Sequence, residues 1–135
     1  EIIKLNEKII RTMKISLESF QKLHYECTNF LKREIEYYTK LNKKIIVITH
    51  FPPIQEFTSD KKIDEEPQCV KDYFASNIIY DMDLQNVKYW IFGHTHFSAI
   101  IQYENIKLIS NQVGYGNENL TSGNLIFDLD NVNYK

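Results

Sequence analysis

VKYWIFGHTH, residues 87–96, joins an apolar run to a glycine and two of the 4 histidines of the chain. The run is short and mixes β-branched with aromatic residues, which is typical of a buried strand. His94 and His96 are two residues apart, so in an extended segment both imidazoles point to the same side and can reach one metal ion or two neighbouring ions. Gly93 has no Cβ, which lets the chain turn sharply and its backbone approach a ligand. This stretch therefore predicts a strand that delivers metal-binding side chains at its end.

A second stretch of the same kind, IIVITHFPP, covers residues 45–53. It begins as a β-branched run that is apolar on both faces, which predicts an interior strand covered on both sides. The strand is expected to end at His50, because the two prolines that follow can continue neither a helix nor a strand ladder. Ligands of open α/β sheets bind beyond the carboxyl ends of the strands. We therefore expect His50, His94 and His96 to meet at one edge of a sheet.

The rest of the chain supplies helices around these strands and further strands after them. Apolar residues recur at helical spacing over residues 17–38, with Ser16 in the N-cap position. Residues 52–68 are polar, acidic and bounded by prolines, which predicts a long surface loop, and residues 69–80 again have helical spacing. This order of helices and strands favours a layered α/β fold. Three strand-like runs close the chain as a β-meander, at residues 97–104, 106–110 and 124–130, with a tight turn at Glu104–Asn105 between the first two.

Charge and composition exclude several classes of partner. The chain has 16 basic and 18 acidic side chains, so no excess positive charge attracts nucleic acid or an anionic membrane. No apolar run approaches the roughly 20 residues that a membrane-spanning helix requires. Cys27 and Cys69 are too few for a disulfide framework. A reducing, cytoplasmic location is the expectation.

Taken together, IIVITHFPP and WIFGHTH resemble the fourth and fifth motifs of the calcineurin-like metallophosphoesterases, in which one strand ends in Thr-His or a similar pair and a later strand ends in Gly-His-x-His. LISNQVGYG, residues 108–116, resembles a Ser-Asn-Pro-Arg-Gly-Tyr stretch of a small branch of that family, and FLKREI, residues 30–35, resembles a helix end that precedes the first of these strands. The resemblance extends over nearly the whole chain from Ser16. It implies the C-terminal half of a layered α/β/β/α sandwich, with a mixed sheet that is flanked by helices and ends in a β-meander.

The family resemblance also implies a site and a reaction. His50 and His94 would ligate one metal of a binuclear pair, and His96 would ligate the other. The cofactors would be two divalent ions, of Mn, Fe, Zn or Ni, that clamp a phosphate-ester substrate and activate water for hydrolysis of mono- or diesters. Asn111 and Tyr115 would lie near the substrate.

The departures from the family pattern are as informative as the matches. The three earlier motifs, Asp-x-His, Gly-Asp-x-x-Asp and Gly-Asn-His-Asp/Glu, are absent. GNEN, residues 116–119, has no histidine and follows the fifth motif, so it is read as a decoy. Phe51 stands where many relatives have a second histidine, while Gln112 and Val113 replace the proline and arginine of the small branch.

These gaps, and a chain that begins at Glu1 rather than at methionine, lead us to expect residues 1–135 to be the C-terminal portion of a single metallophosphoesterase domain whose N-terminal part is missing. The proton donor for the leaving group is expected in that part, so this portion alone is expected to be inactive.

Two other functions remain open from the sequence. One is a scaffold or binding protein of the same fold that has lost catalysis. The other is a small structural zinc site made of His50, His94 and His96 with a fourth ligand such as Cys69, in closed tetrahedral geometry. The fourth histidine of the chain, His24, falls within the predicted long helix and is expected to be structural.

Overall fold

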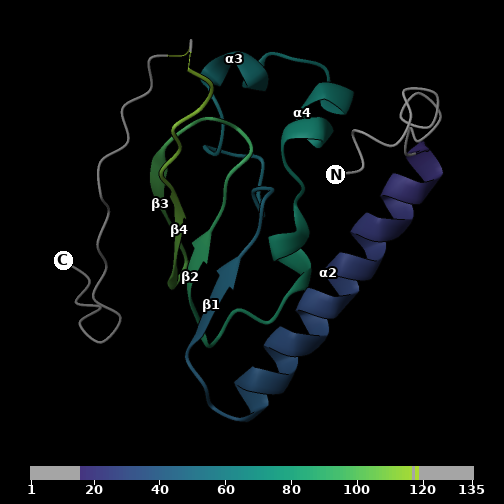
Figure 1. The fold of residues 1–135 in the computed structure, drawn as a ribbon. Coiled ribbons are helices and arrows are strands. Elements are labelled where there is room, and N and C mark those ends of the chain that lie inside the picture. The colour runs from purple at the N-terminus through teal and green to yellow at the C-terminus, as the bar shows by residue number, and fades with distance from the viewer. Residues whose placement is uncertain (1–15, 117, 119–135) are drawn as a thin grey trace, which may run out of the picture. The chain divides into compact units, whose positions relative to one another are not determined.

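The computed structural model describes residues 16–116 and 118, which adopt a mixed α/β fold. The chain divides into two compact units, Glu1–Glu34 and Ile35–Lys135. The strand predicted at residues 124–130 lies outside the described residues. The described elements, in chain order, are α2 (Leu17–Lys40), β1 (Ile45–Ile48), α3 (Lys61–Asp64), α4 (Gln68–Phe74), the 3-10 helix η2 (Ile78–Asp81), β2 (Val87–Ile91), β3 (Ala99–Tyr103) and β4 (Ile106–Ser110) (Figure 1).

The long predicted helix is present as α2, and its start is confirmed. The Ser16 hydroxyl oxygen accepts a hydrogen bond from the Ser19 backbone N–H at 3.1 Å, which satisfies one of the free donors of the first turn. The helix runs two residues past its predicted end to Lys40, and Asn42 then takes a left-handed conformation (φ 51°) that closes it. Of the residues of α2, Ile35 is buried.

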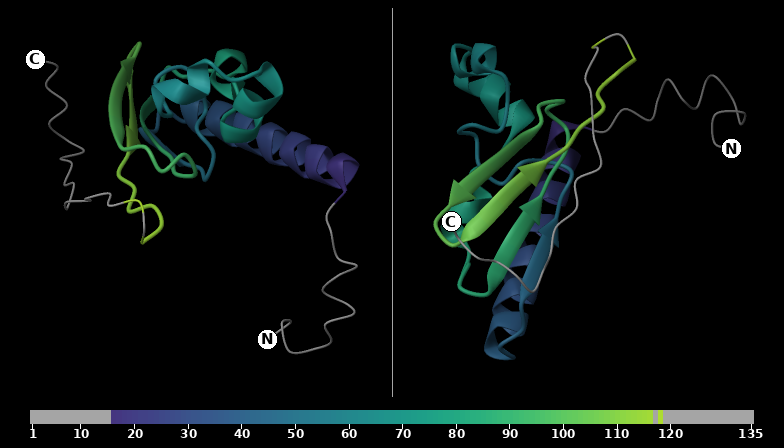
Figure 2. Two further views of the ribbon diagram at one scale, coloured as in Figure 1. Left: turned by 90° about the horizontal axis from the view of Figure 1, so that it is seen from above. Right: turned by 90° about the vertical axis from the view of Figure 1, so that its left-hand side faces the viewer.

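The four described strands form one mixed sheet in the order β1-β2-β4-β3 (Figure 2). β1 pairs with β2 and β2 with β4, both in parallel, while β3 and β4 form an antiparallel hairpin. The hairpin turn lies at Glu104–Asn105, as predicted, and Glu104 has the positive φ (48°) common in tight turns. Because β1, β2 and β4 run in parallel, their carboxyl ends meet at one edge of the sheet.

The central strands hold the core of this unit. Val87 and Trp90 of β2 and Ile106 and Leu108 of β4 are completely buried. The prediction that the first strand is interior and covered on both sides is wrong for the described residues. β1 lies at an edge of the described sheet, and Ile46 and Ile48, on one of its faces, are 41% and 73% exposed. An all-apolar, β-branched run indicates a strand, but it does not show whether the strand lies at the centre or at the edge of its sheet.

The expected surface loop at residues 52–68 is also partly wrong. Pro52 and Pro53 are buried, because their backbone carbonyls accept hydrogen bonds from the segment before β2 and their rings are apolar. Thr58 is buried as well, with its hydroxyl donating to the Ile54 carbonyl at 2.7 Å. The loop then forms the short helix α3, with Asp60 as its N-cap. The helical pattern at residues 69–80 proves to be two elements, α4 and η2, separated by an extended Ala75.

Within the described part of the chain, none of the helices combines the length and the apolar character of a membrane span.

Candidate functional site

A cavity of about 600 Å³ opens where the parallel strands β1, β2 and β4 end, and it is called here the histidine cavity. His50 follows β1, His94 and His96 follow β2, and the segment after β4 completes the wall. The predicted meeting of strand ends therefore places all three histidines around one cavity. Its lining residues used below are His50, His94, His96, Gln112, Tyr115 and Glu118.

His50 is held by the buried core of β2. The indole N–H of the completely buried Trp90 donates to the Thr49 hydroxyl oxygen at 2.9 Å, and that hydroxyl in turn donates to the Phe51 carbonyl at 2.7 Å. The backbone carbonyl of His50 accepts from the Gly93 N–H at 2.9 Å. The residue before His50 and the residue after it are thus tied to neighbouring backbone and core, which limits how far the imidazole can move.

The rings of His50 and His94 are in direct contact. The His94 Nδ1 and His50 Nε2 atoms lie 3.2 Å apart, and the other His94 nitrogen, Nε2, lies 3.2 Å from the Tyr73 carbonyl oxygen. A carbonyl can only accept, so Nε2 carries the proton and the Nδ1 lone pair points toward His50. Burial, and then the charge of His50, lower the pKa of His94. The neutral imidazole that this favours is the form that ligates metals.

The backbone turns sharply at the two histidines themselves rather than at Gly93. His94 and His96 have φ angles of 73° and 51°, in the left-handed region that residues other than glycine seldom adopt. Gly93 is not among the residues with positive φ, and a Cβ there would make an ordinary contact, 3.5 Å from the His50 carbonyl oxygen. The expected role of Gly93 in the turn is therefore wrong. Such strained backbone persists where the surroundings enforce it, and it concentrates at functional sites.

His96 faces the segment that follows β4. Its Nδ1 lies 2.8 and 3.1 Å from the two carboxylate oxygens of Glu118, and its ring packs edge-on to Tyr115 with centroids 4.5 Å apart. The Tyr115 backbone N–H donates to the same carboxylate at 2.8 Å. That amide first, and His96 second, lower the pKa of Glu118. A carboxylate at Nδ1 fixes the proton there and leaves the Nε2 lone pair available, which is the usual support of a metal-binding histidine.

Sequence reasoning missed Glu118. The GNEN stretch that contains Glu118 lacks the histidine of a family motif, so the sequence does not mark it as a site segment. Glu118 also lies 22 residues from His96, so no local pattern predicts their contact. Gly114, with a φ of 69°, turns the chain so that Tyr115 and Glu118 return to the histidine, and a side chain there would be strained. Only the path of the folded chain brings the carboxylate to the ring.

The other predicted residues are placed less centrally. Asn111, which directly follows β4, is exposed and does not line the histidine cavity. Cys69 is an exposed free thiol on α4 and does not line it either. His24 lies in the Glu1–Glu34 unit, where its carbonyl accepts from the Thr28 hydroxyl at 2.9 Å.

The fit of the site to a metal ion is partial. Ring nitrogens 3.2 Å apart, as in His50 and His94, can both reach one ion at the ordinary nitrogen–metal distance of about 2.1 Å. Among residues 16–116 and 118, however, no three His, Cys, Asp or Glu side chains converge closely enough to hold a metal. The sequence predicts that all three histidines converge in one site. In the structure His50 pairs with His94, and His96 lines the same cavity outside that pair.

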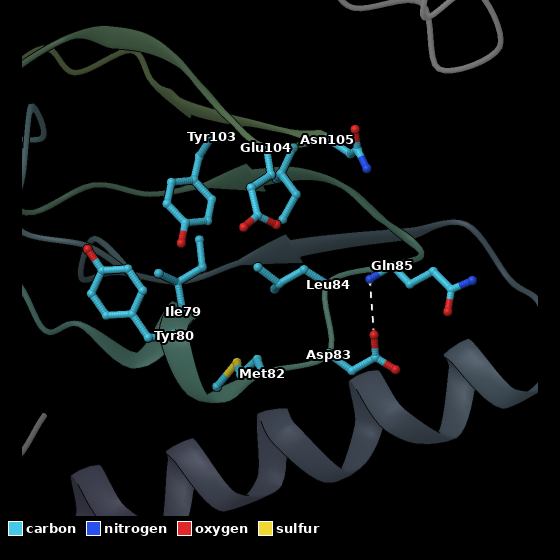
Figure 3. Close-up of a pocket in the computed structure, with 10 residues that line it drawn as sticks. Ile79, Tyr80, Met82, Asp83, Leu84, Gln85, Tyr103, Glu104 and Asn105 are labelled. Atoms are coloured by element: carbon cyan, nitrogen blue, oxygen red, sulfur yellow. Dashed lines mark hydrogen bonds between the residues drawn. The ribbon is translucent and has the colours of Figure 1, made fainter.

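A second cavity, of about 520 Å³, lies at the other end of the sheet and is called here the tyrosine cavity. It is formed by the hairpin turn and by the residues just before β2, and Figure 3 shows Tyr103 and Glu104 on one side of it with Tyr80 and Asp83 on the other. No histidine is among its lining residues. The Tyr80 hydroxyl donates to Glu56 at 3.0 Å, and this bond raises the pKa of Tyr80.

Comparison with known proteins gives one distant relative and no family. No family model matches the chain, and no solved structure is significantly similar to it. The chain is 24% identical over 110 residues to the uncharacterized protein L509 of Acanthamoeba polyphaga mimivirus. The match covers 78% of this chain and 38% of that protein, so the chain corresponds to well under half of the relative's length.

Proposed function

We propose that this chain is part of a metal-dependent phosphoesterase that hydrolyses phosphate mono- or diesters. One observation carries the proposal most strongly. Two histidines that follow adjacent parallel strands bring their ring nitrogens to 3.2 Å in an open cavity, although the two residues are 44 positions apart in the sequence. The two ring nitrogens in this contact are also the atoms through which neutral imidazoles ligate a metal. They are well suited to share a metal ion.

The finer fold assignment belongs to the same proposal. The mixed sheet, with three parallel strands whose carboxyl ends surround the cavity, is compatible with one half of a layered α/β/β/α sandwich. In this arrangement the remaining ligands, carboxylates above all, come from a preceding part of the protein. Three neutral imidazoles cannot offset the repulsion of two divalent ions at short range, so a bridging carboxylate is required.

The residues of the histidine cavity have distinct parts in the proposed reaction. His50 and His94 hold one ion, and His96 holds a second through Nε2 while Glu118 keeps the proton on Nδ1. Bound ions, of Mn, Fe, Zn or Ni, supply the positive charge that orients the phosphate and activates water. The exposed ring of Tyr115, which lines the cavity, is the proposed contact to the ester, whereas Asn111, just after β4, lies outside the lining.

Turnover by the longer parent and by this chain alone tests the proposal. The parent, loaded with Mn²⁺, should hydrolyse a nitrophenyl phosphodiester, and a chelator should abolish that activity until metal is restored. Residues 1–135 alone should stay near background under the same conditions, because the carboxylate ligands are lacking. A parent that binds metal without turnover would support the inactive scaffold instead. One chelator-resistant zinc ion held by the chain alone would support the structural site.

A further inference from the structure

The side chain of Gln112 has several polar partners among the described residues at the histidine cavity. Its Oε1 accepts the backbone N–H of His96 at 2.8 Å. Its Nε2 lies 3.1 Å from the Phe97 carbonyl oxygen, 2.5 Å from the Ser110 hydroxyl and 3.2 Å from the Thr95 hydroxyl. The side chain of Gln112 thus joins the end of β4 to Thr95, His96 and Phe97, three consecutive residues of the loop that follows β2.

The orientation of this amide is dictated by its partners. The His96 N–H can only donate and the Phe97 carbonyl can only accept, so the oxygen of Gln112 must face the first and the nitrogen the second. The backbone N–H of Gln112 is bonded as well, to the Ser98 hydroxyl at 2.9 Å. Few residues satisfy this set, because it requires an acceptor and a donor side by side on a side chain of this length.

The bonds fall on the part of the chain where the backbone is strained. His94 and His96 both have positive φ, a strained conformation that persists only where the surroundings enforce it. Gln112 bonds the His96 amide directly and holds Thr95 and Phe97 on either side of it. The amide and the ring of His96 are therefore fixed from one segment, the amide by Gln112 and the ring by Glu118.

We propose that Gln112 is a positioning residue, which holds the strained His94–His96 loop so that His96 presents Nε2 to a metal ion. The metal-binding half of this inference rests on the proposed function. The positioning half rests on hydrogen bonds between described residues.

Two measurements, hydrogen exchange on residues 1–135 and metal binding by the longer parent, test the two halves separately. The first is hydrogen exchange of the His96 backbone amide without metal. Gln112→Leu removes the acceptor while keeping a side chain of similar size, and exchange should become at least about fivefold faster, as expected for the loss of one hydrogen bond. The second is a Zn²⁺ titration of the longer parent, which would supply the carboxylate ligands, followed by the imidazole ¹⁵N signals. The Zn²⁺ concentration that half-shifts the His96 signal should rise by about tenfold or more, the usual effect of removing a supporting partner of a ligand.

Gln102→Leu is the matched control. Gln102 lies in β3, and its Nε2 donates to the Glu104 and Ile106 carbonyls at 2.7 and 3.1 Å, near the hairpin turn at the other end of the strands from the histidines. The control loses two hydrogen bonds of the same kind, so both His96 readouts should stay at wild-type values. Gln112→Glu is a second variant of nearly the same shape. It serves as the test if Gln112→Leu fails to fold. Its carboxylate keeps the acceptor for the His96 backbone N–H, so exchange of that amide should stay as slow as in wild type.

The outcomes separate the two claims. Unchanged exchange and unchanged Zn²⁺ response in a folded Gln112→Leu chain would overturn the positioning role and leave the proposed function standing. Faster exchange with no Zn²⁺ response in wild type, even with the parent's preceding part supplied, would retain the clamp and overturn the metal site. If Gln112→Leu and Gln102→Leu changed the two His96 readouts equally, the cause would be general destabilisation of the fold, and the inference would be overturned.

Discussion

The two cavities of this protein are similar in size, about 600 and 520 Å³, but lie at opposite ends of the same strands and differ in their chemistry. The tyrosine cavity follows from the hairpin turn, and the positive φ of Glu104 is what that turn requires. Of the residues other than glycine that line the histidine cavity, His94 and His96 have positive φ, in a loop that is not a two-residue hairpin, and the side chains of Gln112 and Glu118 bond to His96. Volume therefore does not distinguish the two cavities, whereas strained backbone at two imidazole side chains does.

The largest expected effect separates a cavity histidine from a helical one. In the intact parent at saturating metal, His96→Ala should lower turnover by at least about 100-fold, because a lost ligand removes a charge contribution of several kcal/mol to the barrier. Its denaturation midpoint should change little, since His96 lies in a loop. His24→Ala, on α2, should leave turnover unchanged and cost at most about 1 kcal/mol of stability. Normal turnover in His96→Ala would require the metal assignment to be withdrawn.

A smaller effect, on stability, tests whether the histidine cavity is anchored in the core. Thr49→Val keeps the shape of the side chain but leaves the buried Trp90 indole N–H without its acceptor, which should cost about 1–3 kcal/mol in the free energy of unfolding. The single tryptophan of the chain makes this measurable by fluorescence during urea denaturation. Thr28→Val, on α2, is the matched control and should stay within about 0.5 kcal/mol of wild type. Equal midpoints for the two variants would refute the anchor.

The smallest effect compares a carboxylate from each cavity. Glu118→Gln removes the negative charge that holds the proton on His96 Nδ1. The Zn²⁺ affinity of the parent should fall by about tenfold, a small effect for the loss of a residue that supports a metal ligand, because the Gln amide oxygen can still accept the His96 hydrogen bond. Glu104→Gln, at the tyrosine cavity, should leave the affinity unchanged. Competition with a chromophoric chelator measures both. An equal loss in the two variants would point to general electrostatic attraction rather than to a contact at His96.

Local pattern was enough to predict the elements that carry the site. The strand ends before His50 and His94, the Ser16 cap and the Glu104–Asn105 turn are all where the residues predict them. Each of these depends on residues within a few positions of one another, through side-chain alternation, a capping hydroxyl or the sterics of a two-residue turn. The contact between the His50 and His94 rings also follows, since it requires only that two parallel strands be neighbours.

Errors arose where the outcome depends on which segments become neighbours. β1 is an edge strand of the described sheet although its sequence reads as interior, and Pro52 and Pro53 are buried although their segment reads as a surface loop. Neither burial on both faces nor exposure of a loop is a local property. Both depend on what the rest of the chain places against the segment.

By itself, the sequence determined the strands, the helix and the histidines at the strand ends, because these depend on chemistry within a short window of residues. The tertiary structure alone decided that His96 bonds Glu118 and that Gln112 clamps its amide. It also decided that the left-handed turn falls on the two histidines instead of on Gly93. Each of these results from segments 16 to 22 residues apart meeting at the end of the sheet, where hydrogen bonds across the gap outweigh the local preference of the backbone.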